Sequence, residues 1–154
     1  MQDLSFDGIV FTKGGEGFES APYLDSGDVP TIGFGSTYYE DGTKVRMTDA
    51  PITMERAATL FSVTMRIYVN AVRAAIKTPL KQYQFDALVS LCYNIGVAAF
   101  SSSTLVKVIN AGQDEDAITF QFMRWNKDNG KVVKGLTNRR AKEVKLYHKG
   151  IYHD

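Results

Sequence analysis

The chain has 154 residues and a formal net charge of +1, so its overall charge does not indicate a nucleic-acid or membrane partner. Apolar residues make up 44% of it, with eight Tyr and nine Phe, which excludes a disordered chain and allows one domain or two small lobes. No apolar run is long enough for a transmembrane helix, and the acidic start lacks the positive charge of a signal peptide. We therefore expect no signal peptide and no signal-anchor.

Charge is distributed unevenly along the chain. Residues 1–55 contain ten acidic and three basic residues, whereas residues 124–149 contain nine Lys or Arg against Asp128 and Glu143. This pattern is typical of a solvated helix face, but it also fits a basic surface held against a polyanion such as bacterial cell wall, nucleic acid or anionic lipid. The single cysteine, Cys92, excludes an intramolecular disulfide, and its apolar neighbours predict a buried thiol.

The N-terminal half combines helix signals with a β-rich segment. Ser5 is expected to cap a helix that ends at Lys13, before two glycines. Residues 20–48 mix Pro and Gly with β-branched and aromatic residues, which predicts short antiparallel strands and tight turns. Thr53 should cap the next helical stretch. A long helix is predicted over residues 62–77, where Val63, Ile67, Ala71 and Ala74 recur at helical spacing. With Val69, Val72 and Ile76 beside them, this helix is apolar around much of its girth, as a helix with neighbours on several sides would be.

The C-terminal half is predicted to be helical. Helices are expected over 81–95, from Ser102 or Ser103 to 109, over 114–125 and over 136–149, with a loop at 126–135. The predicted fold class is α+β and mainly α, with a small N-terminal antiparallel β-lobe joined by a long helix to a helical lobe. We expect a single domain, 1–154, made of a β-containing lobe at about 15–61, a connecting helix at 62–77, and a helical lobe formed by 1–14 and 78–154.

Glycines and acidic residues are densest in residues 14–35, a composition that taken alone is more typical of turns than of catalysis. Glu16 lies between two glycines just past a predicted helix end, whose partial negative charge disfavours an ionised carboxylate. A raised pKa would let Glu16 donate a proton near neutral pH. Asp25 follows in a polar turn and should stay ionised. Two carboxyl groups in different environments suit glycoside hydrolysis, and the Thr31 hydroxyl could hold a water against Asp25.

The same segment resembles the active-site segment of the phage-type lysozymes, glycoside hydrolase family 24, which includes the T-even and lambdoid phage endolysins. The resemblance rests on Glu16-Gly17, Ala21-Pro22-Tyr23-Leu24-Asp25, Gly27 and Pro30-Thr31-Ile32-Gly33-Phe34-Gly35. It continues over most of the chain, through Gln84-Phe85-Asp86-Ala87-Leu88-Val89-Ser90, Tyr93-Asn94-Ile95-Gly96, Ala99-Phe100, Ser103-Thr104-Leu105, Asn110-Ala111-Gly112, Trp125, Gly135-Leu136 and Arg139-Arg140-Ala141-Lys142-Glu143. One position departs from the pattern, because Ser36 stands where many relatives carry His.

The resemblance implies a lysozyme-like fold and a muramidase that cleaves the β-1,4 bond between N-acetylmuramic acid and N-acetylglucosamine in peptidoglycan. Glu16 would be the general acid, and Asp25 and Thr31 would position the attacking water in an inverting cleavage. Arg140 would support Glu16, although it can equally be one basic residue among many on its helix. The resemblance also implies that Gly35, Tyr93 and Asn94 bind the substrate. Tyr93 and Asn94 can equally be residues of an ordinary helix end.

The resemblance also implies how such an enzyme would act in the cell. It would be a monomer without cofactor or metal, with no nucleic-acid partner and no stable membrane association. It would stay in the host cytoplasm until a holin releases it to the wall. Two alternatives remain open: a wall-binding module without turnover, and a lytic transglycosylase, which forms an anhydro sugar.

Other candidate sites are weaker. Glu19 competes with Glu16 as the acid but lacks the glycine neighbours. Residues 25–28 superficially resemble a calcium loop, but no Glu follows at the required spacing. His148, His153 and Asp154 do not make a metal site without further ligands.

Overall fold

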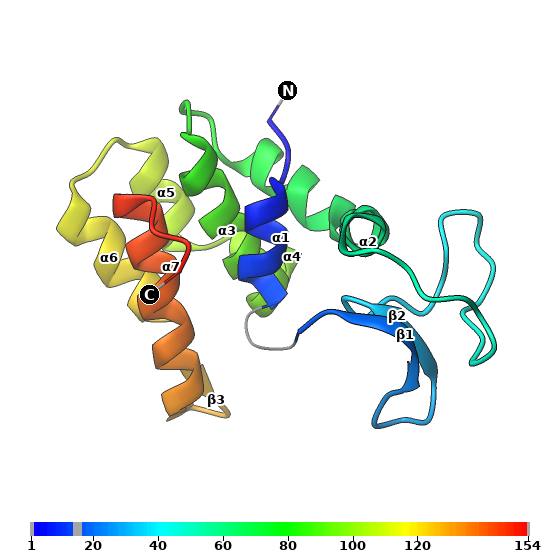
Figure 1. Cartoon of the computed structure of the whole chain (residues 1–154). Helices are drawn as coiled ribbons and strands as arrows, with labels where there is room; N and C mark the ends of the chain where they lie inside the picture. Colours follow the sequence, from blue (N-terminus) through cyan, green and yellow to red (C-terminus); the bar gives the residue numbers. More distant parts are fainter. Residues whose placement is uncertain (1, 14–16, 154) are drawn as a thin grey trace. The chain divides into compact units, whose positions relative to one another are not determined.

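The structure of the chain is a computed structural model that describes residues 2–13 and 17–153 (Figure 1). The chain divides into two compact units, which we call the helical unit, residues 1–11 and 67–154, and the β unit, residues 12–66. Helices α1 (Phe6–Lys13) and α2 (Met54–Ala75) each contribute to both units. The division therefore falls inside α2, whereas the sequence-based division places a separate connecting helix at 62–77.

The β unit is built on a short antiparallel pair. Strand β1 (Glu19–Leu24) pairs with β2 (Pro30–Gly33), so that Tyr23 lies opposite Thr31. Isolated bridges continue the ladder from Ile32 to Ser36 and from Tyr38 to Lys44. This confirms the antiparallel region predicted over 20–48. Its core consists of Ile32, Val45 and Leu60, with Tyr39 and Ile52 packed against them.

Close packing between β2 and the start of α2 requires a glycine. Gly33 has a φ of 68°, and a Cβ added there would lie 2.8 Å from the Cβ of Ala57. Any other residue would force β2 away from the helix and would be strained at this φ. The Phe34 ring follows directly and packs at a tilt against Phe18 and Phe61, with ring centroids 5.8 and 6.5 Å away.

Helix α2 begins eight residues earlier than the predicted start at 62. The Thr53 hydroxyl accepts a hydrogen bond from the Arg56 N–H at 3.1 Å, so the predicted cap opens one continuous helix. The predicted apolar residues divide into two groups, because Val63 and Ile67 are 59% and 60% exposed, whereas Val69, Val72 and Ile76 are buried. The buried face is formed by Ala57, Phe61, Met65, Val69 and Val72. The helix has more than one apolar stripe, and the packing partners decide which one is buried.

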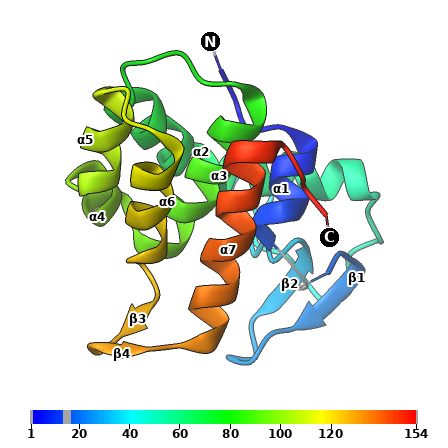
Figure 2. The ribbon, with the colours of Figure 1, turned by 90° about the vertical axis from the view of Figure 1, so that its left-hand side faces the viewer.

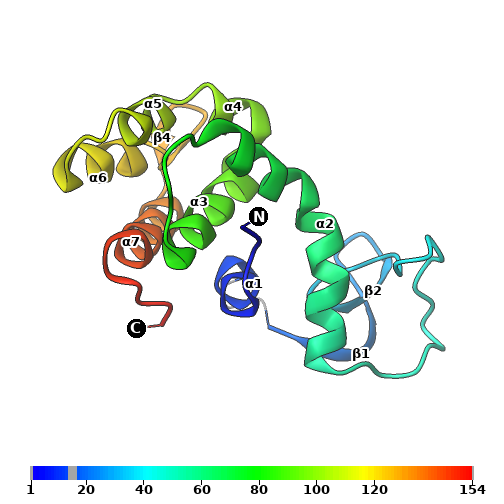
Figure 3. The ribbon, with the colours of Figure 1, turned by 90° about the horizontal axis from the view of Figure 1, so that it is seen from above.

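The helical unit is assembled around α3 (Gln82–Ile95). Eight consecutive residues, from Phe85 to Cys92, are buried, so α3 is surrounded on all sides. Burial raises the pKa of the Cys92 thiol to about 12, which fits the predicted inert cysteine. Helix α7 (Lys134–Lys149) packs on α3 and on α6 (Glu115–Met123), and α5 (Thr104–Asn110) packs on α6 and on the short α4 (Val97–Ser101) (Figures 2 and 3).

Three predicted helix starts in this unit are confirmed by their caps. The hydroxyls of Ser5 and Ser103 accept hydrogen bonds from the N–H groups of Gly8 and Val106. The carboxylate of Asp114 accepts from the Ala117 N–H at 2.9 Å. Capping is local chemistry, so it can be inferred from the sequence without knowledge of the fold.

A second, smaller hairpin was not predicted. Strands β3 (Lys127–Asp128) and β4 (Lys131–Val132) pair within the segment expected to be a loop. Asn129 and Gly130 have φ of 51° and 78°, the left-handed pair that a tight two-residue turn requires. The Asn-Gly sequence was the available signal. The strands are only two residues long, too short to show an alternating pattern.

Candidate active site

The predicted catalytic and substrate-binding residues are distributed over both units. Glu16 lies outside the described residues. Asp25, Thr31 and Gly35 belong to the β unit, and Tyr93, Asn94 and Arg140 belong to the helical unit.

Asp25 follows directly on β1 and organises the turn that leads to β2. Its Oδ1 accepts hydrogen bonds from the N–H groups of Gly27 and Val29 at 2.8 and 2.9 Å. Its own N–H donates to the Val29 carbonyl at 3.1 Å. The side chain is half-buried, and no donor from residues 2–13 or 17–153 binds Oδ2. The turn therefore fixes the orientation of the carboxylate and leaves Oδ2 available to a water.

Thr31 lies on β2 and is 3% exposed. Its hydroxyl donates to the Val29 carbonyl at 2.8 Å. Val29 thus binds both predicted side chains, Asp25 through its N–H and Thr31 through its carbonyl. With its proton donated to the backbone, the Thr31 oxygen keeps its lone pairs for accepting a hydrogen bond.

Gly35 is exposed and lies beside a cation that sequence analysis did not assign to the site. It has a φ of 97°, and a Cβ added there would lie 3.2 Å from the ammonium of Lys13. That ammonium lies 5.2 Å from the centre of the Phe61 ring. Lys13 stands in the sequence only as the last residue of α1, and no pattern indicates that it reaches the segment after β2.

In the helical unit, Tyr93 and Asn94 lie near the end of α3. The Tyr93 ring contacts Tyr68 edge to face, with centroids 5.3 Å apart. Asn94 is exposed and lines a depression of about 500 Å³ together with Ile95, Trp125, Lys127, Asp128, Val133 and Leu136. The two neighbouring residues therefore have different surroundings, and only Asn94 lines this depression.

Arg140 is fully buried in an ion-pair network between α3 and α7. Its Nε lies 2.6 Å from Glu143 Oε1, its Nη2 donates to Oε2 at 3.2 Å, and its Nη1 donates to the Trp125 carbonyl at 3.1 Å. The Ser90 hydroxyl also donates to Glu143, at 2.6 Å, and Arg139 lies 3.4 Å from the same carboxylate. Burial lowers the pKa of Arg140 and raises that of Glu143, while the guanidinium groups favour the charged carboxylate.

This network was not predicted as such. The sequence places Arg139, Arg140 and Glu143 on one helix, but Ser90 is about 50 residues away on α3. Every bond of Arg140 described above stays within the helical unit, so its predicted support of Glu16 remains a prediction.

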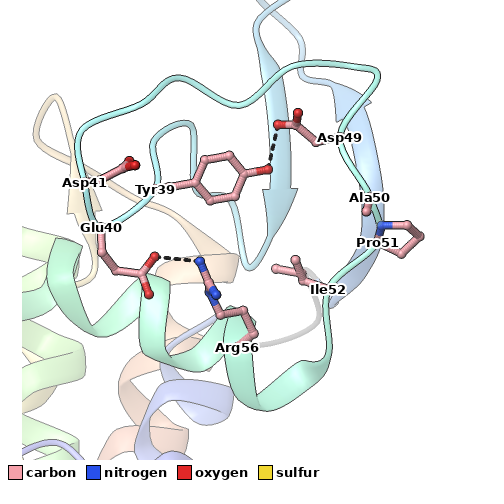
Figure 4. Close-up of a pocket in the computed structure, with 8 residues that line it drawn as sticks. All are labelled: Tyr39, Glu40, Asp41, Asp49, Ala50, Pro51, Ile52 and Arg56. Carbon is pink, nitrogen blue, oxygen red and sulfur yellow. Dashed lines mark hydrogen bonds and ion pairs between the residues drawn. The ribbon is translucent and has the colours of Figure 1, made fainter.

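A second depression, of about 540 Å³, lies in the β unit and contains none of the predicted residues (Figure 4). The Tyr39 hydroxyl donates to Asp49 at 2.7 Å, and Arg56 pairs with Glu40 at 2.9 Å. Burial and the neighbouring Asp49 raise the pKa of Tyr39 to about 12. The polar groups of this depression are bonded to one another. They therefore hold the loop against the first turns of α2.

The weaker candidates have ordinary surroundings. Glu19 is exposed at the start of β1, and the acidic residues of 25–28 form the hairpin turn described above. His148 contacts the Thr119 hydroxyl at 2.9 Å and lies 3.8 Å from Glu115. These two contacts of His148 join α7 to α6. Asp154 lies outside the described residues. Within 2–13 and 17–153, no three His, Cys, Asp or Glu side chains gather as metal ligands, and no helix has both the length and the apolar character to cross a membrane.

Comparisons with known proteins agree on one family. A sequence model described as phage lysozyme matches residues 13–143. The endolysin of Salmonella phage P22 is 35% identical over 147 residues, covering 96% of this chain and 99% of that protein. The endolysin of Bacillus phage PZA is 38% identical over 149 residues, covering 96% of this chain and 55% of that protein. The chain thus spans about half the length of the two matched Bacillus phage endolysins.

Solved structures agree with the sequence matches. The crystal structure of a P22 lysozyme mutant superposes with a TM-score of 0.80 at 35% identity, covering 96% of this chain and 99% of that one. The muramidase domain of SpmX from Asticaccaulis excentricus gives a TM-score of 0.70 at 30% identity, covering 96% of this chain and 99% of that one. These matches confirm the predicted mainly α, α+β fold and the resemblance on which the enzyme class was predicted.

Proposed function

Because this chain belongs to the phage lysozyme family, we propose that it is an endolysin-type muramidase that hydrolyses the β-1,4 bond between N-acetylmuramic acid and N-acetylglucosamine in peptidoglycan. The observation that carries the proposal is the pair formed by Asp25 and Thr31, both bonded to the backbone of Val29. A water between Asp25 Oδ2 and the Thr31 oxygen would donate a hydrogen bond to each. Its lone pair would then point away from both, toward a sugar carbon.

In this mechanism Asp25 acts as the general base and Glu16 as the general acid. Glu16 protonates the leaving oxygen, while Asp25 takes a proton from the attacking water. Attack on the face opposite the leaving group inverts the anomeric centre. Since Asp25 Oδ1 is held by two backbone N–H groups, the base needs no rearrangement when the water arrives.

The remaining predicted residues have supporting roles in the proposal. Gly35 lets the glycan approach the backbone closely, and Tyr93 and Asn94 bind sugars. Arg140, held by Glu143, gives the helical unit a fixed positive charge that supports Glu16. We also propose that the enzyme acts as a monomer and reaches the wall from the host cytoplasm through a holin.

Three single variants test the catalytic set: Glu16→Gln, Asp25→Asn and Thr31→Val. We expect each of the first two to lower the release of reducing ends from purified wall by about 10²-fold or more, and Thr31→Val to have a smaller effect that Thr31→Ser partly restores. Glu19→Gln and Asp28→Asn are matched controls and should retain wild-type rates. Wild-type rates in Glu16→Gln would reject the assignment of the acid.

Product analysis separates hydrolysis from the alternatives. Hydrolysis adds one water per bond cleaved, whereas a transglycosylase leaves an anhydro sugar, and mass spectrometry distinguishes them. A binding module would release nothing. NMR of fresh products should show the α-anomer first if the water attacks as proposed, and a β-anomer would contradict the direct displacement.

A further inference from the structure

The exposed side of α7 carries a row of lysines. Lys134, Lys142, Lys145 and Lys149 are all exposed, and at about 100° per residue they fall within an arc of about 80°. The row extends about 22 Å along the helix axis. Figure 2 shows α7 along the near side of the helical unit, with the β3–β4 hairpin at its first turn. Lys131, in that hairpin, is also exposed and lies opposite Asp128 in the strand register.

No acidic side chain of the helix offsets this charge. The only acidic residue of α7 is Glu143, which is fully buried and paired with Arg140 on the opposite side. Among the residues that the structure describes, no carboxylate pairs with Lys134, Lys142 or Lys149. These three lysines therefore place positive charge along the whole length of α7.

The dipole favours Lys149 in the last turn, but two other features of the row work against the stability of the helix. Lys134 lies at the N-terminal end, where the helix dipole disfavours a cation, and the first turn holds no acidic residue. Lys142 and Lys145 are three residues apart, and Lys145 and Lys149 four, so like charges are neighbours on the surface. A surface that served only solubility would intersperse acidic residues here.

The surface also lacks what a bilayer would require. Within α7, all of whose residues are described, no large apolar side chain is exposed, and the apolar residues Leu146 and Tyr147 face the core. The nearby exposed apolar residues, Val132 and Val133, belong to the hairpin and to the residue before the helix. A row of ammonium groups whose exposed apolar neighbours, Val132, Val133 and Ile151, lie only beyond its two ends on α7 suits a flexible, hydrated polyanion.

We propose that the lysine row of α7 is a second binding surface, which holds a phosphodiester-bearing wall polymer such as teichoic acid. The lysines recur at axial intervals of roughly 5–12 Å, close enough for consecutive phosphates of an extended chain to neutralise them. The positive end of the helix dipole adds to the potential at Lys134. This surface presumes the wall as the target of the proposed function, but it binds independently of cleavage.

The test uses the full chain with Lys134, Lys142 and Lys149 changed to Gln, and a control with Lys44, Lys77 and Lys107 changed to Gln. Both variants lose three exposed charges, but the control lysines lie outside the row. Cosedimentation with teichoic-acid-rich walls is measured between 25 and 200 mM salt, about the range over which phosphate contacts are screened. The row variant should bind weakly, with the slope of log affinity against log salt reduced by about 2, while the control should match the wild type.

Further arms decide the ligand. Removal of the phosphodiester polymer with hydrofluoric acid should abolish the difference between the two variants, and soluble glycerol-phosphate polymer should compete with the wall. Three results would each overturn the proposal. The first is equal weakening of wall binding in both variants, and the second is an unchanged difference between the variants on extracted wall. The third is preferential binding of the wild type to phosphatidylglycerol vesicles. Cleavage of a short soluble glycan fragment reports the proposed function separately, and the row variant should retain it.

Discussion

The two units place their charged groups in opposite surroundings, buried in one and open to solvent in the other. The helical unit buries Arg140 and Glu143 as a pair and buries Asp86 as an acceptor for several donors. The β unit instead holds Asp25 and Asp49 at turns, where backbone N–H groups bind them and solvent still reaches them. Charges in the first unit fix helices to one another. Those in the second are oriented without being enclosed, which is the condition a catalytic base requires.

Asp86 shows how far the helical unit depends on such a group. Its carboxylate accepts hydrogen bonds from the Ser5 hydroxyl and N–H, from Gln82 at 2.9 Å and from the Tyr152 hydroxyl at 2.6 Å. It therefore joins both ends of the chain to α3. A Cβ on Gly8 would lie 2.5 Å from the Asp86 carboxyl carbon, so α1 can approach α3 only through a glycine.

The largest loss of stability should come from breaking the buried pair in the helical unit. Glu143→Ala leaves the Arg140 guanidinium buried without its carboxylate, and we expect the free energy of unfolding in urea to fall by about 3–5 kcal/mol. The double variant Arg140→Met, Glu143→Leu removes both charges and should lose much less. A single variant no less stable than the double one would show that the pair does not anchor α7.

A smaller loss is expected at Asp86. In Asp86→Asn an amide NH₂ replaces one carboxylate oxygen and faces donors, so about 1.5–3 kcal/mol of unfolding free energy should be lost. The matched change in the β unit, Asp49→Asn, affects an exposed carboxylate and should cost less. Equal losses of unfolding free energy in the two variants would show that the two units depend equally on these carboxylates.

Acid should act on the exposed carboxylates of the β unit. The N–H of Arg46 and the hydroxyl of Tyr39 lower the pKa of Asp49, so the unfolded chain takes up this proton before the folded one does. The contribution of Asp49 is therefore complete above the unfolded pKa and is lost as the pH falls through the folded one. Thermal unfolding from pH 6 to pH 2 should show a shallower decline in Asp49→Asn than in the wild type, and parallel curves would argue against this linkage.

The smallest effect is expected at Ser36. It is 5% exposed, and its hydroxyl has no hydrogen-bond partner among the described residues. Ser36→Ala should change the free energy of unfolding by no more than about 0.5 kcal/mol, or raise it slightly, because it removes a buried polar group. Ser90→Ala is the control in the helical unit, since it deprives Glu143 of a donor and should cost about 1–3 kcal/mol.

Much of this protein follows from local sequence. The caps at Ser5, Thr53, Ser103 and Asp114, the stop at Gly96 and the antiparallel region are determined by groups within a few residues of one another. The motifs of residues 16–35, combined with those quoted for the rest of the chain, were sufficient to identify the family. Such features are available to sequence analysis because turn and cap chemistry acts over short distances.

The tertiary structure decided what depends on distant partners. It selected the buried stripe of α2, paired Glu143 with Ser90 across about 50 residues, and brought Lys13 beside Gly35. It also showed that Val29, a residue without functional chemistry of its own, joins Asp25 to Thr31. Burial and long-range hydrogen bonds depend on which surfaces pack together. A sequence pattern indicates only which surfaces could pack, not which of them do.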